Sequence, residues 1–300
     1  MEALILTPDS SPLSRNIDDY PEGIIIPIDK PYRWTSADVI RKVKYTAIRH
    51  FGKKNLKVGH AGTLDPLATG VLLVCIGKAT KLAEELQSHD KEYIAGITFG
   101  ATTPSYDLEK EIDRFFPHEH IDAEAVEAAL PAFIGEQDQI APLFSAKSVD
   151  GVRAYELARK LHAEGKTLDE AAAELIRVSK IKITEIELIE YRADDGCFKN
   201  RATPLAAGGR SDEVTSGVVF KTTSSAPSSR INVTDNSALG LPHAVVRMAC
   251  SKGTYVRAFA RDLGESLGSG AHLDSLQRSR SGIFRVENAL SVEQALNLLN

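Results

Sequence analysis

The twelve residues GHAGTLDPLATG (59–70) constrain the fold of this 300-residue chain more than any other segment. Three glycines, one proline and two threonines interrupt any regular element, so we predict a tight, irregular loop. The apolar run VLLVCIG (71–77) follows directly and predicts a buried strand. The loop is therefore held beside ordered structure, and loops on rigid frames are common places for functional side chains.

Two side chains in this loop could carry chemistry, the carboxylate of Asp65 and the imidazole of His60. An Asp before a proline is also a common turn former or helix cap, and local chemistry alone favours that structural role. The glycine spacing does not match a phosphate-binding P-loop. A metal site is poorly supported, because His60 and Asp65 have no third ligand at a recognisable spacing.

Short apolar strands and amphipathic helices alternate along the chain, which favours an α+β domain with a mixed or antiparallel sheet. For the first helix, Ser36 is the predicted N-cap and Gly52 the predicted end. Strands are predicted over 23–29, 71–77, 91–100, 178–190 and 243–250, and helices over 36–51, 79–87, 122–129, 155–163, 168–174, 254–267 and 292–300.

Two segments lack these patterns. Residues 1–21 are polar and contain three prolines, so we expect a loose N-terminal tail. In residues 193–242, Ser, Thr, Gly and Pro supply 20 of the 50 positions. Such a segment buries too little apolar surface to offset its ordering entropy, which predicts a flexible surface insertion.

The net charge is −5, yet the basic residues are segregated from the acidic ones. Residues 41–57 contain seven Lys or Arg and no acid, residues 244–261 contain no acid either, and three arginines follow at Arg278, Arg280 and Arg285. Each run taken alone is typical of a solvated helix face. Several acid-free runs in one chain indicate a polyanionic partner.

Composition and termini exclude several other classes of protein. No apolar run approaches the roughly 20 residues of a membrane span, and the N-terminus carries no secretory signal pattern. The three cysteines are far apart and odd in number, which indicates neither a disulfide framework nor a zinc site and fits a reducing cytoplasm.

A second candidate stretch is SKGTYVRAFARDLG (251–264), where a helix should begin near Thr254. Arg257 then lies in the first turn, where the helix dipole disfavours a cation unless a carboxylate is close. An exposed arginine paired with Asp262 is the simpler alternative. Tyr93 lies on a predicted alternating strand, where an aromatic side chain is by default a half-buried sheet residue.

Five segments in order resemble bacterial tRNA pseudouridine synthases of the TruB type. They are DKP (29–31), GHAGTLDPLATGVLLVCIGKATK (59–81), KEY (91–93), FSAKSVDGVRAYELAR (144–159) and CSKGTYVRAFARDLGESLGSGAHLDSLQR (250–278). The resemblance covers residues 22–192 and 243–299, and its loop string is long and specific. It implies an α+β pseudouridine synthase fold, with a mixed, largely antiparallel sheet flanked by helices.

The resemblance also implies a domain organisation and an activity. We expect one catalytic domain over 22–300, interrupted by the insertion at 193–242, and no C-terminal PUA domain. The implied reaction isomerises uridine 55 in the T loop of tRNA, after the base leaves its stack. No cofactor, metal or obligate protein partner is implied, and we expect a cytoplasmic monomer whose partner is the T arm of tRNA.

Roles for three residues follow from the same resemblance. Asp65 is the implied catalytic carboxylate, acting either by covalent attack or by removing a sugar proton. Arg257 would pair with Asp65 and keep it ionised. Tyr93 would stack on the flipped base.

Other implied contacts surround that carboxylate. Tyr255 and Leu276 would close the pocket, and His60 would take the place that the base vacates. Lys30 and the basic run 41–57 would hold RNA phosphates.

The chain departs from the better-known family pattern at one relevant place. Where a T-D-T-x-D string is expected, it reads TTPSYDLE (102–109), so no role is assigned to Asp107. Two other functions stay open from the residues alone: a non-catalytic RNA-binding module, and a hydrolase with two carboxylates. The hydrolase lacks a convincing second carboxylate near the loop.

Overall fold

A computed structural model describes residues 2–142, 148–149, 152–153, 178–193 and 231–300. The helices predicted over 155–163 and 168–174, and most of the predicted insertion, lie outside these residues. The chain divides into two compact units, described separately here. Unit 1 comprises Met1–Tyr93, Phe198–Ile231 and Gln277–Asn300, and unit 2 comprises Ile94–Cys197 and Asn232–Leu276.

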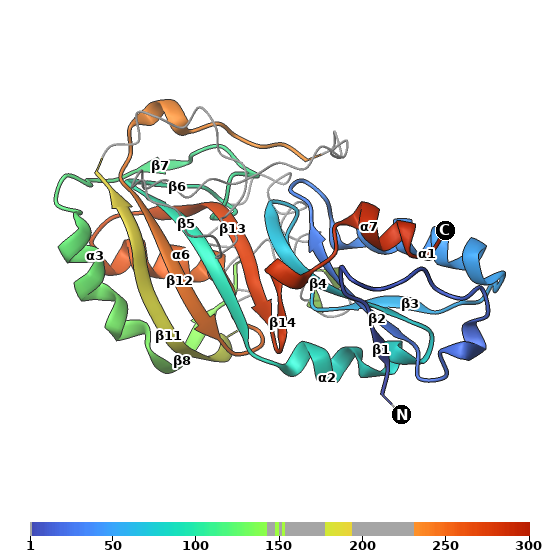
Figure 1. The fold of residues 1–300 in the computed structure, drawn as a ribbon. Helices are drawn as coiled ribbons and strands as arrows, with labels where there is room; N and C mark the ends of the chain where they lie inside the picture. The colour runs from blue at the N-terminus through green and yellow to red at the C-terminus, as the bar shows by residue number, and fades with distance from the viewer. Residues whose placement is uncertain (1, 143–147, 150–151, 154–177, 194–230) are drawn as a thin grey trace, which may run out of the picture. The chain divides into compact units, whose positions relative to one another are not determined.

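The sheet of unit 1 is built around β4, the strand that follows the Asp65 loop (Figure 1). Strand β2 runs antiparallel to β4, from Ile24 opposite Ile76 to Lys30 opposite Gly70. Strand β3 also pairs antiparallel with β4, so the two strands on either side of the loop are neighbours. The strands of this unit are β1 (Leu4–Ile5), β2 (Ile24–Lys30), β3 (Val58–Ala61), β4 (Ala68–Ile76) and β14 (Phe284–Arg285).

Helix α1 (Ser36–Phe51) confirms the predicted helix at both ends and on its buried face. Its buried side chains include Val39, Val43 and Ala47, spaced four residues apart, and the cap Gly52 has a left-handed φ of 63°. The N-cap, however, is Thr35 in a capping box with Asp38, because the Ser36 hydroxyl is engaged elsewhere. The other helices of unit 1 are η1 (Ile17–Asp19), η2 (Gly77–Leu82), α2 (Ala83–Ser88), η5 (Val286–Asn288) and α7 (Val292–Asn297).

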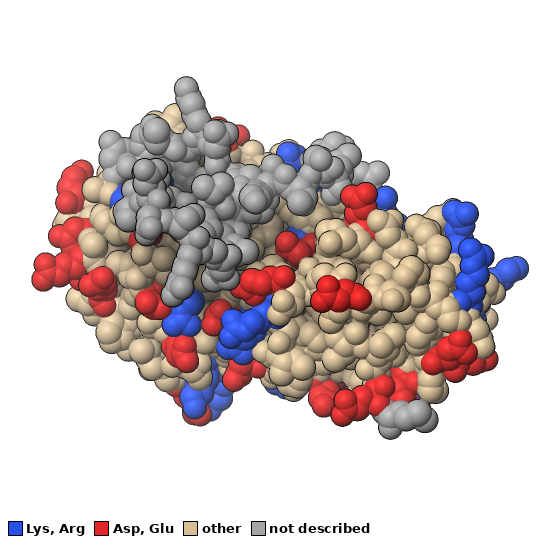
Figure 2. Space-filling view, in the orientation of Figure 1, with Lys and Arg blue, Asp and Glu red and all other residues tan. Residues whose placement is uncertain are grey.

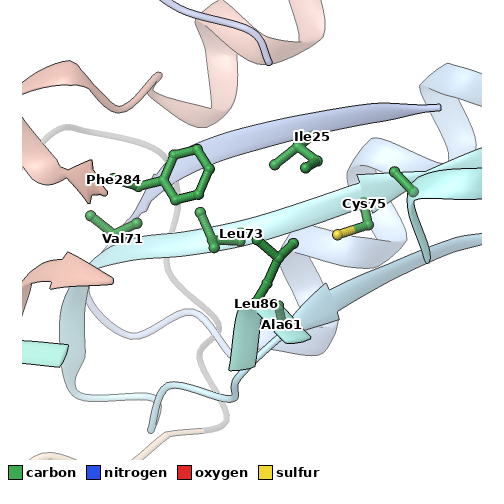
Figure 3. Close-up of a cluster of buried hydrophobic side chains, with 8 residues drawn as sticks. Ile25, Ala61, Val71, Leu73, Cys75, Leu86 and Phe284 are labelled. Carbon is green, nitrogen blue, oxygen red and sulfur yellow. The ribbon is translucent and has the colours of Figure 1, made fainter. Parts of the chain in front are cut away.

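A cluster of buried side chains joins β4 to its neighbours in unit 1 (Figure 3). It contains Ile25, Ala61, Val71, Leu73, Cys75, Ala79, Leu86 and Phe284. Burying a side chain as large as leucine stabilises a fold by roughly 1.5–3 kcal/mol. The cluster therefore fixes β4 firmly, directly after the loop that carries Asp65.

The expectation of a loose N-terminal tail is wrong. Strand β1 pairs parallel with β2, and the backbone N–H of Leu6 donates to the carbonyl of Ile25 at 2.9 Å. The Leu6 side chain is 1 % exposed. A short apolar run, Leu4 to Leu6, is enough to add an edge strand even where the surrounding residues are polar.

Unit 2 contains an antiparallel sheet in which β12 and β8 flank β11. The strands β5 and β13 each contribute residues to both units. The strands are β5 (Lys91–Phe99), β6 (Ala101–Thr102), β7 (Arg114–Phe115), β8 (Gly135–Ile140), β9 (Ser148–Val149), β10 (Val152–Arg153), β11 (Val178–Arg192), β12 (His243–Cys250) and β13 (Ala271–Ser281). The helices are α3 (Ala123–Ala129), η3 (Leu130–Phe133), η4 (Ser237–Leu239) and α6 (Val256–Ser266).

The pairings confirm the predicted α+β class with a mixed, largely antiparallel sheet. The pair β1–β2 is parallel, whereas β2–β4, β3–β4, β11–β12 and β8–β11 are antiparallel. Helices α1 and α2 contact β3, and α3 contacts β11. Within the described parts of the chain, no helix has the length and apolar character needed to cross a membrane.

Candidate functional site

The Asp65 loop is shorter than predicted, because the first residues of the motif form β3 and leave residues 62–67 as the turn. Its backbone is fixed on both sides of Asp65. The Ser36 hydroxyl accepts a hydrogen bond from the Leu64 N–H at 2.9 Å and donates to the Leu64 carbonyl at 3.1 Å. After the carboxylate, the Ala68 N–H donates to the Asp65 carbonyl at 3.1 Å. The loop is thus held by the first turn of α1.

The Lys30 side chain is hydrogen-bonded to the same loop and is too deeply buried to reach an RNA phosphate. Its ammonium donates to the carbonyl oxygens of Pro31 at 2.9 Å, Trp34 at 2.6 Å and Pro66 at 3.2 Å. These bonds use all three donors, and the side chain is 0 % exposed. The predicted phosphate contact of Lys30 is therefore wrong, and the side chain instead fixes the peptide group between Pro66 and Leu67.

Burial dominates the electrostatics of Lys30. Desolvation lowers the pKa of the ammonium to about 7, and the nearby Asp65 and Asp29 carboxylates offset only part of that fall. Asp29 itself accepts a hydrogen bond from the Gly70 N–H at 3.0 Å. Its pKa is raised, mainly by burial. The ionisable side chains of Lys30 and Asp29 thus lie in a poorly hydrated environment, where electrostatic interactions between charges are strong.

His60 lies on β3 opposite Val74. Burial lowers its pKa, and the Arg278 guanidinium lowers it further. Among the residues that the structure describes, the buried Nδ1 atom of His60 finds no hydrogen-bond partner.

Arg278 belongs to an acid-free stretch, yet it serves the structure of unit 1. Its guanidinium donates to the carbonyl of Val71 at 2.7 Å and to that of Gly62 at 3.1 Å. A side chain at Gly70 would collide with the Arg278 backbone, since a Cβ there would lie 2.3 Å from the carbonyl oxygen. The glycine that ends the loop motif therefore permits this close approach.

In unit 2, Arg257 is buried on α6 and has a carboxylate beside it. Its Nη1 donates to the Ser105 carbonyl at 3.1 Å and lies 3.6 Å from Oδ2 of Asp107. Asp107 is fixed in turn, because its Oδ1 accepts from the Ser105 hydroxyl at 2.6 Å and from the Glu109 N–H at 3.0 Å. The alternative of an exposed arginine is wrong, since Arg257 is 5 % exposed and Asp262 pairs with Arg261 instead.

Asp107 is the functional candidate that the sequence reasoning missed. The sequence around Asp107 departs from the expected T-D-T-x-D string. The local feature that could have pointed to Asp107 is the Ser-Tyr-Asp turn, in which a serine lies two residues before the acid. Between them, Tyr106 has a φ of 54°, a left-handed conformation that costs a non-glycine residue about 1–3 kcal/mol. A fold tolerates such strain where neighbouring bonds hold the residue in place.

The remaining predicted site residues are placed as follows. Tyr255 is the N-cap of α6 and lies before the helix, which begins at Val256, two residues later than predicted. The Gln139 side chain binds Tyr255 twice, accepting from its N–H at 2.8 Å and donating to its carbonyl at 3.1 Å. Tyr93 is largely buried on β5, and Leu276 is half-buried on β13.

Unit 1 therefore contains four predicted residues, Lys30, His60, Asp65 and Tyr93, and Asp65 lies close enough to Lys30 to raise its pKa. The predicted pairing of Asp65 with Arg257 stays a prediction. No group of three or more His, Cys, Asp or Glu side chains within the described ranges is arranged to hold a metal ion. What the geometry offers is a carboxylate on a braced loop, with the buried Lys30 amine near it.

Comparison with known proteins assigns this arrangement to a family. The family model described as "TruB family pseudouridylate synthase (N terminal domain)" matches residues 49–201. A tRNA pseudouridine synthase B of Phocaeicola vulgatus is 46 % identical over 275 residues, which is 92 % of each chain. This chain belongs to the TruB family of pseudouridine synthases.

Other TruB relatives and solved structures agree. The tRNA pseudouridine synthase B of Thermus thermophilus is 40 % identical over 266 residues, covering 88 % of this chain and 75 % of its own length. A chain from a Cbf5–Nop10–Gar1 complex superposes with a TM-score of 0.55 at 22 % identity. That match covers 97 % of this chain and 58 % of the other chain. It confirms the pseudouridine synthase fold.

Membership of the TruB family gives the site a chemical meaning. Pseudouridine synthases are isomerases, so the substrate supplies every atom of the product and a carboxylate is sufficient for covalent or proton-transfer steps. The described surroundings of Asp65 are suited to either role, because the loop backbone is fixed before any substrate arrives.

Proposed function

We propose that this TruB family member converts uridine 55 in the T loop of tRNA to pseudouridine, with Asp65 as the essential carboxylate. The observation that carries the proposal is the braced loop between β3 and β4, which holds one acid in the family motif. The names of the relatives, tRNA pseudouridine synthase B, support tRNA as the substrate.

The reaction balances without a co-reactant. The N-glycosidic bond from N1 of the uracil breaks, the uracil turns while it stays in the pocket, and its C5 atom bonds to the same sugar carbon. C5 then loses its proton and N1 takes one up, so the product is an isomer of the substrate. Asp65 either attacks the sugar carbon and leaves again, or removes a sugar proton and later returns one to the product. The target nucleotide must leave its stack first, since the sugar–base bond is otherwise out of reach.

Other predicted residues take supporting roles in this proposal. Arg257 keeps Asp65 ionised and oriented, and Tyr93 stacks on the detached base, which is worth about 1–3 kcal/mol. Tyr255 and Leu276 close the pocket, and His60 occupies the position that the base leaves. The enzyme acts as a cytoplasmic monomer on the T arm.

The test is pseudouridine mapping on an unmodified tRNA transcript. We expect wild type to modify one T-loop uridine, and Asp65→Asn to lose at least about a thousandfold in turnover, because the amide neither attacks nor accepts a proton. Asp138→Asn is the matched control, since this exposed acid lies on β8, within unit 2. Absence of product with wild type, or full activity of Asp65→Asn, rejects the proposal. Tight tRNA binding without turnover would instead favour the non-catalytic RNA-binding module.

A further inference from the structure

Helix α6 begins without a capping side chain of its own. Its N-cap, Tyr255, makes no side-chain cap hydrogen bond, and the third helical residue is Ala258, which has no polar group to reach back to the Tyr255 N–H. By contrast, α1 and α7 are capped locally, each by a capping box between its N-cap and the residue three positions later. The start of α6 therefore needs polar partners from another part of the chain.

Gln139 of β8 supplies those partners, although it lies 116 positions away from Tyr255 in the sequence. Its side-chain oxygen accepts a hydrogen bond from the Tyr255 N–H at 2.8 Å, and its amide nitrogen donates to the Tyr255 carbonyl at 3.1 Å. One planar amide thus binds both polar groups of a single backbone residue. The two bonds hold the Tyr255 backbone in one orientation, because a rotation about its φ or ψ angle would break one of them.

The burial of Gln139 gives these two bonds their importance. The other residues of β8 are exposed or half-buried, whereas Gln139 is 2 % exposed. The exposed Glu136 and Asp138 lie opposite Lys182 and Lys180 of β11, and Figure 2 shows acidic and basic side chains interspersed over this part of unit 2. A buried amide costs free energy unless its polar groups are hydrogen-bonded. Among the described residues, the hydrogen bonds of this amide all go to the residue that precedes α6.

A second contact joins the same end of β8 to α6. The guanidinium of Arg261 on the helix donates to the Ile140 carbonyl at 3.1 Å. Strand β8 is itself held by antiparallel pairing with β11, in which Gln139 lies opposite Ser179. The start of α6 is therefore fixed by a strand of the sheet, and a group held by a regular element is placed more precisely than one held by a loop.

We propose that Gln139 is a positioning residue for the reaction: through the Tyr255 backbone, it holds the Tyr255 side chain in the place where that side chain closes the pocket. The inference rests on the proposed function, which gives Tyr255 this place. The Tyr255 side chain is half-buried, so part of its ring is open to a substrate. A displacement of about 1 Å in a group that orients the substrate can lower the rate roughly 100-fold.

The test measures kcat and KM for pseudouridine formation on an unmodified tRNA transcript. Gln139→Met removes both hydrogen bonds and keeps the length of the side chain. Gln139→Glu keeps the oxygen that accepts from the Tyr255 N–H and, when ionised, lacks the donor to the Tyr255 carbonyl. Gln137→Met is the matched control, since this half-buried glutamine lies on the same strand and donates to the Phe133 carbonyl instead. Thermal unfolding, followed by circular dichroism, shows that each variant is folded at the assay temperature.

We expect kcat to fall roughly 10- to 100-fold in Gln139→Met and by a smaller factor in Gln139→Glu, with KM within about threefold of wild type. Gln137→Met should keep the kcat of wild type. In a Tyr255→Ala background, Gln139→Met should lower kcat by less than about threefold, because the ring that Gln139 positions is already absent.

Four results overturn the proposal: unchanged kcat in the folded Gln139 variants, a rise in KM alone, an equal fall of kcat in Gln137→Met, or the same loss with and without the Tyr255 ring. If Gln139→Met does not fold, Gln139→Glu decides the question, since it keeps one of the two bonds. Failure of the proposed function is seen separately, as wild type that forms no pseudouridine on the transcript, and the positioning role then falls with it.

Discussion

Two buried cations, one in each unit, are held in different ways. Lys30 in unit 1 donates to three neutral carbonyl oxygens, whereas Arg257 in unit 2 lies beside the Asp107 carboxylate as well as a carbonyl. The neutral partners do not compensate the charge of Lys30, so its pKa falls to about 7. The guanidinium of Arg257 stays charged, and the Asp107 carboxylate beside it offsets part of that charge. In unit 1, Lys30 thus holds a loop through hydrogen bonds. In unit 2, the permanent charge of Arg257 lies beside a carboxylate.

The largest expected effect on stability comes from a change at Asp107, the carboxylate beside Arg257. Asp107→Asn removes the carboxylate that lies 3.6 Å from the buried Arg257 guanidinium, and breaking a buried ion pair costs about 3–5 kcal/mol. We expect a fall of that order in the free energy of unfolding, measured by urea denaturation. Asp113→Asn is the control, since that exposed acid accepts a single bond from Thr102. A loss below about 1 kcal/mol would show that the ion pair contributes little.

The role of the largely buried Tyr93 is tested on turnover. Tyr93→Leu removes the aromatic face, and a lost stacking energy of about 1–3 kcal/mol corresponds to a roughly 5- to 150-fold lower kcat. The expected change in tRNA affinity is smaller, because the ring acts mainly after the base has flipped. Tyr93→Phe keeps the ring and should keep most activity. An effect confined to KM would contradict this role.

The bracing of the loop is tested at Ser36. Ser36→Ala removes both hydrogen bonds to Leu64 and leaves a buried N–H unsatisfied, at a cost of about 1–2 kcal/mol in the free energy of unfolding. Turnover should fall as well, since Leu64 precedes Asp65. Thr35→Ala is the control: it removes the cap of α1, costs about 1 kcal/mol, and leaves the Leu64 bonds intact. Equal turnover in the two variants would mean that Ser36 does not position the acid.

The smallest expected effect is a pH dependence of the free energy of unfolding, caused by the buried Lys30. Its folded pKa of about 7 lies below its ordinary value of 10.5, so the unfolded chain binds more protons between these values. The free energy of unfolding should therefore rise by about 1 kcal/mol from pH 7 to pH 8. Above pH 9 the Cys75 thiol, whose pKa burial raises to about 11, acts in the opposite direction. Lys30→Met should flatten the rise, and an equally steep rise in that variant would assign it to other groups.

Several elements were predictable from local pattern. The apolar spacing of Val39, Val43 and Ala47 identified α1, and the continuous apolar run before Ile76 identified β4. Strand β13 was missed, because its sequence AHLDSLQRSRS looks like a polar surface segment. Its buried Arg278 is satisfied by carbonyl oxygens more than 200 positions earlier in the chain, which no local window contains.

By itself, the sequence determined the family, the loop that carries Asp65 and the alternation of strands and helices, because these depend on neighbouring residues. Tertiary structure alone decided that Lys30 donates to backbone carbonyl oxygens and that Asp107 lies beside Arg257. Each of those facts is a matter of burial or of partners from distant segments. Desolvation and hydrogen bonding act on residues that are close in space. Local sequence patterns do not show which distant residues become neighbours in the fold.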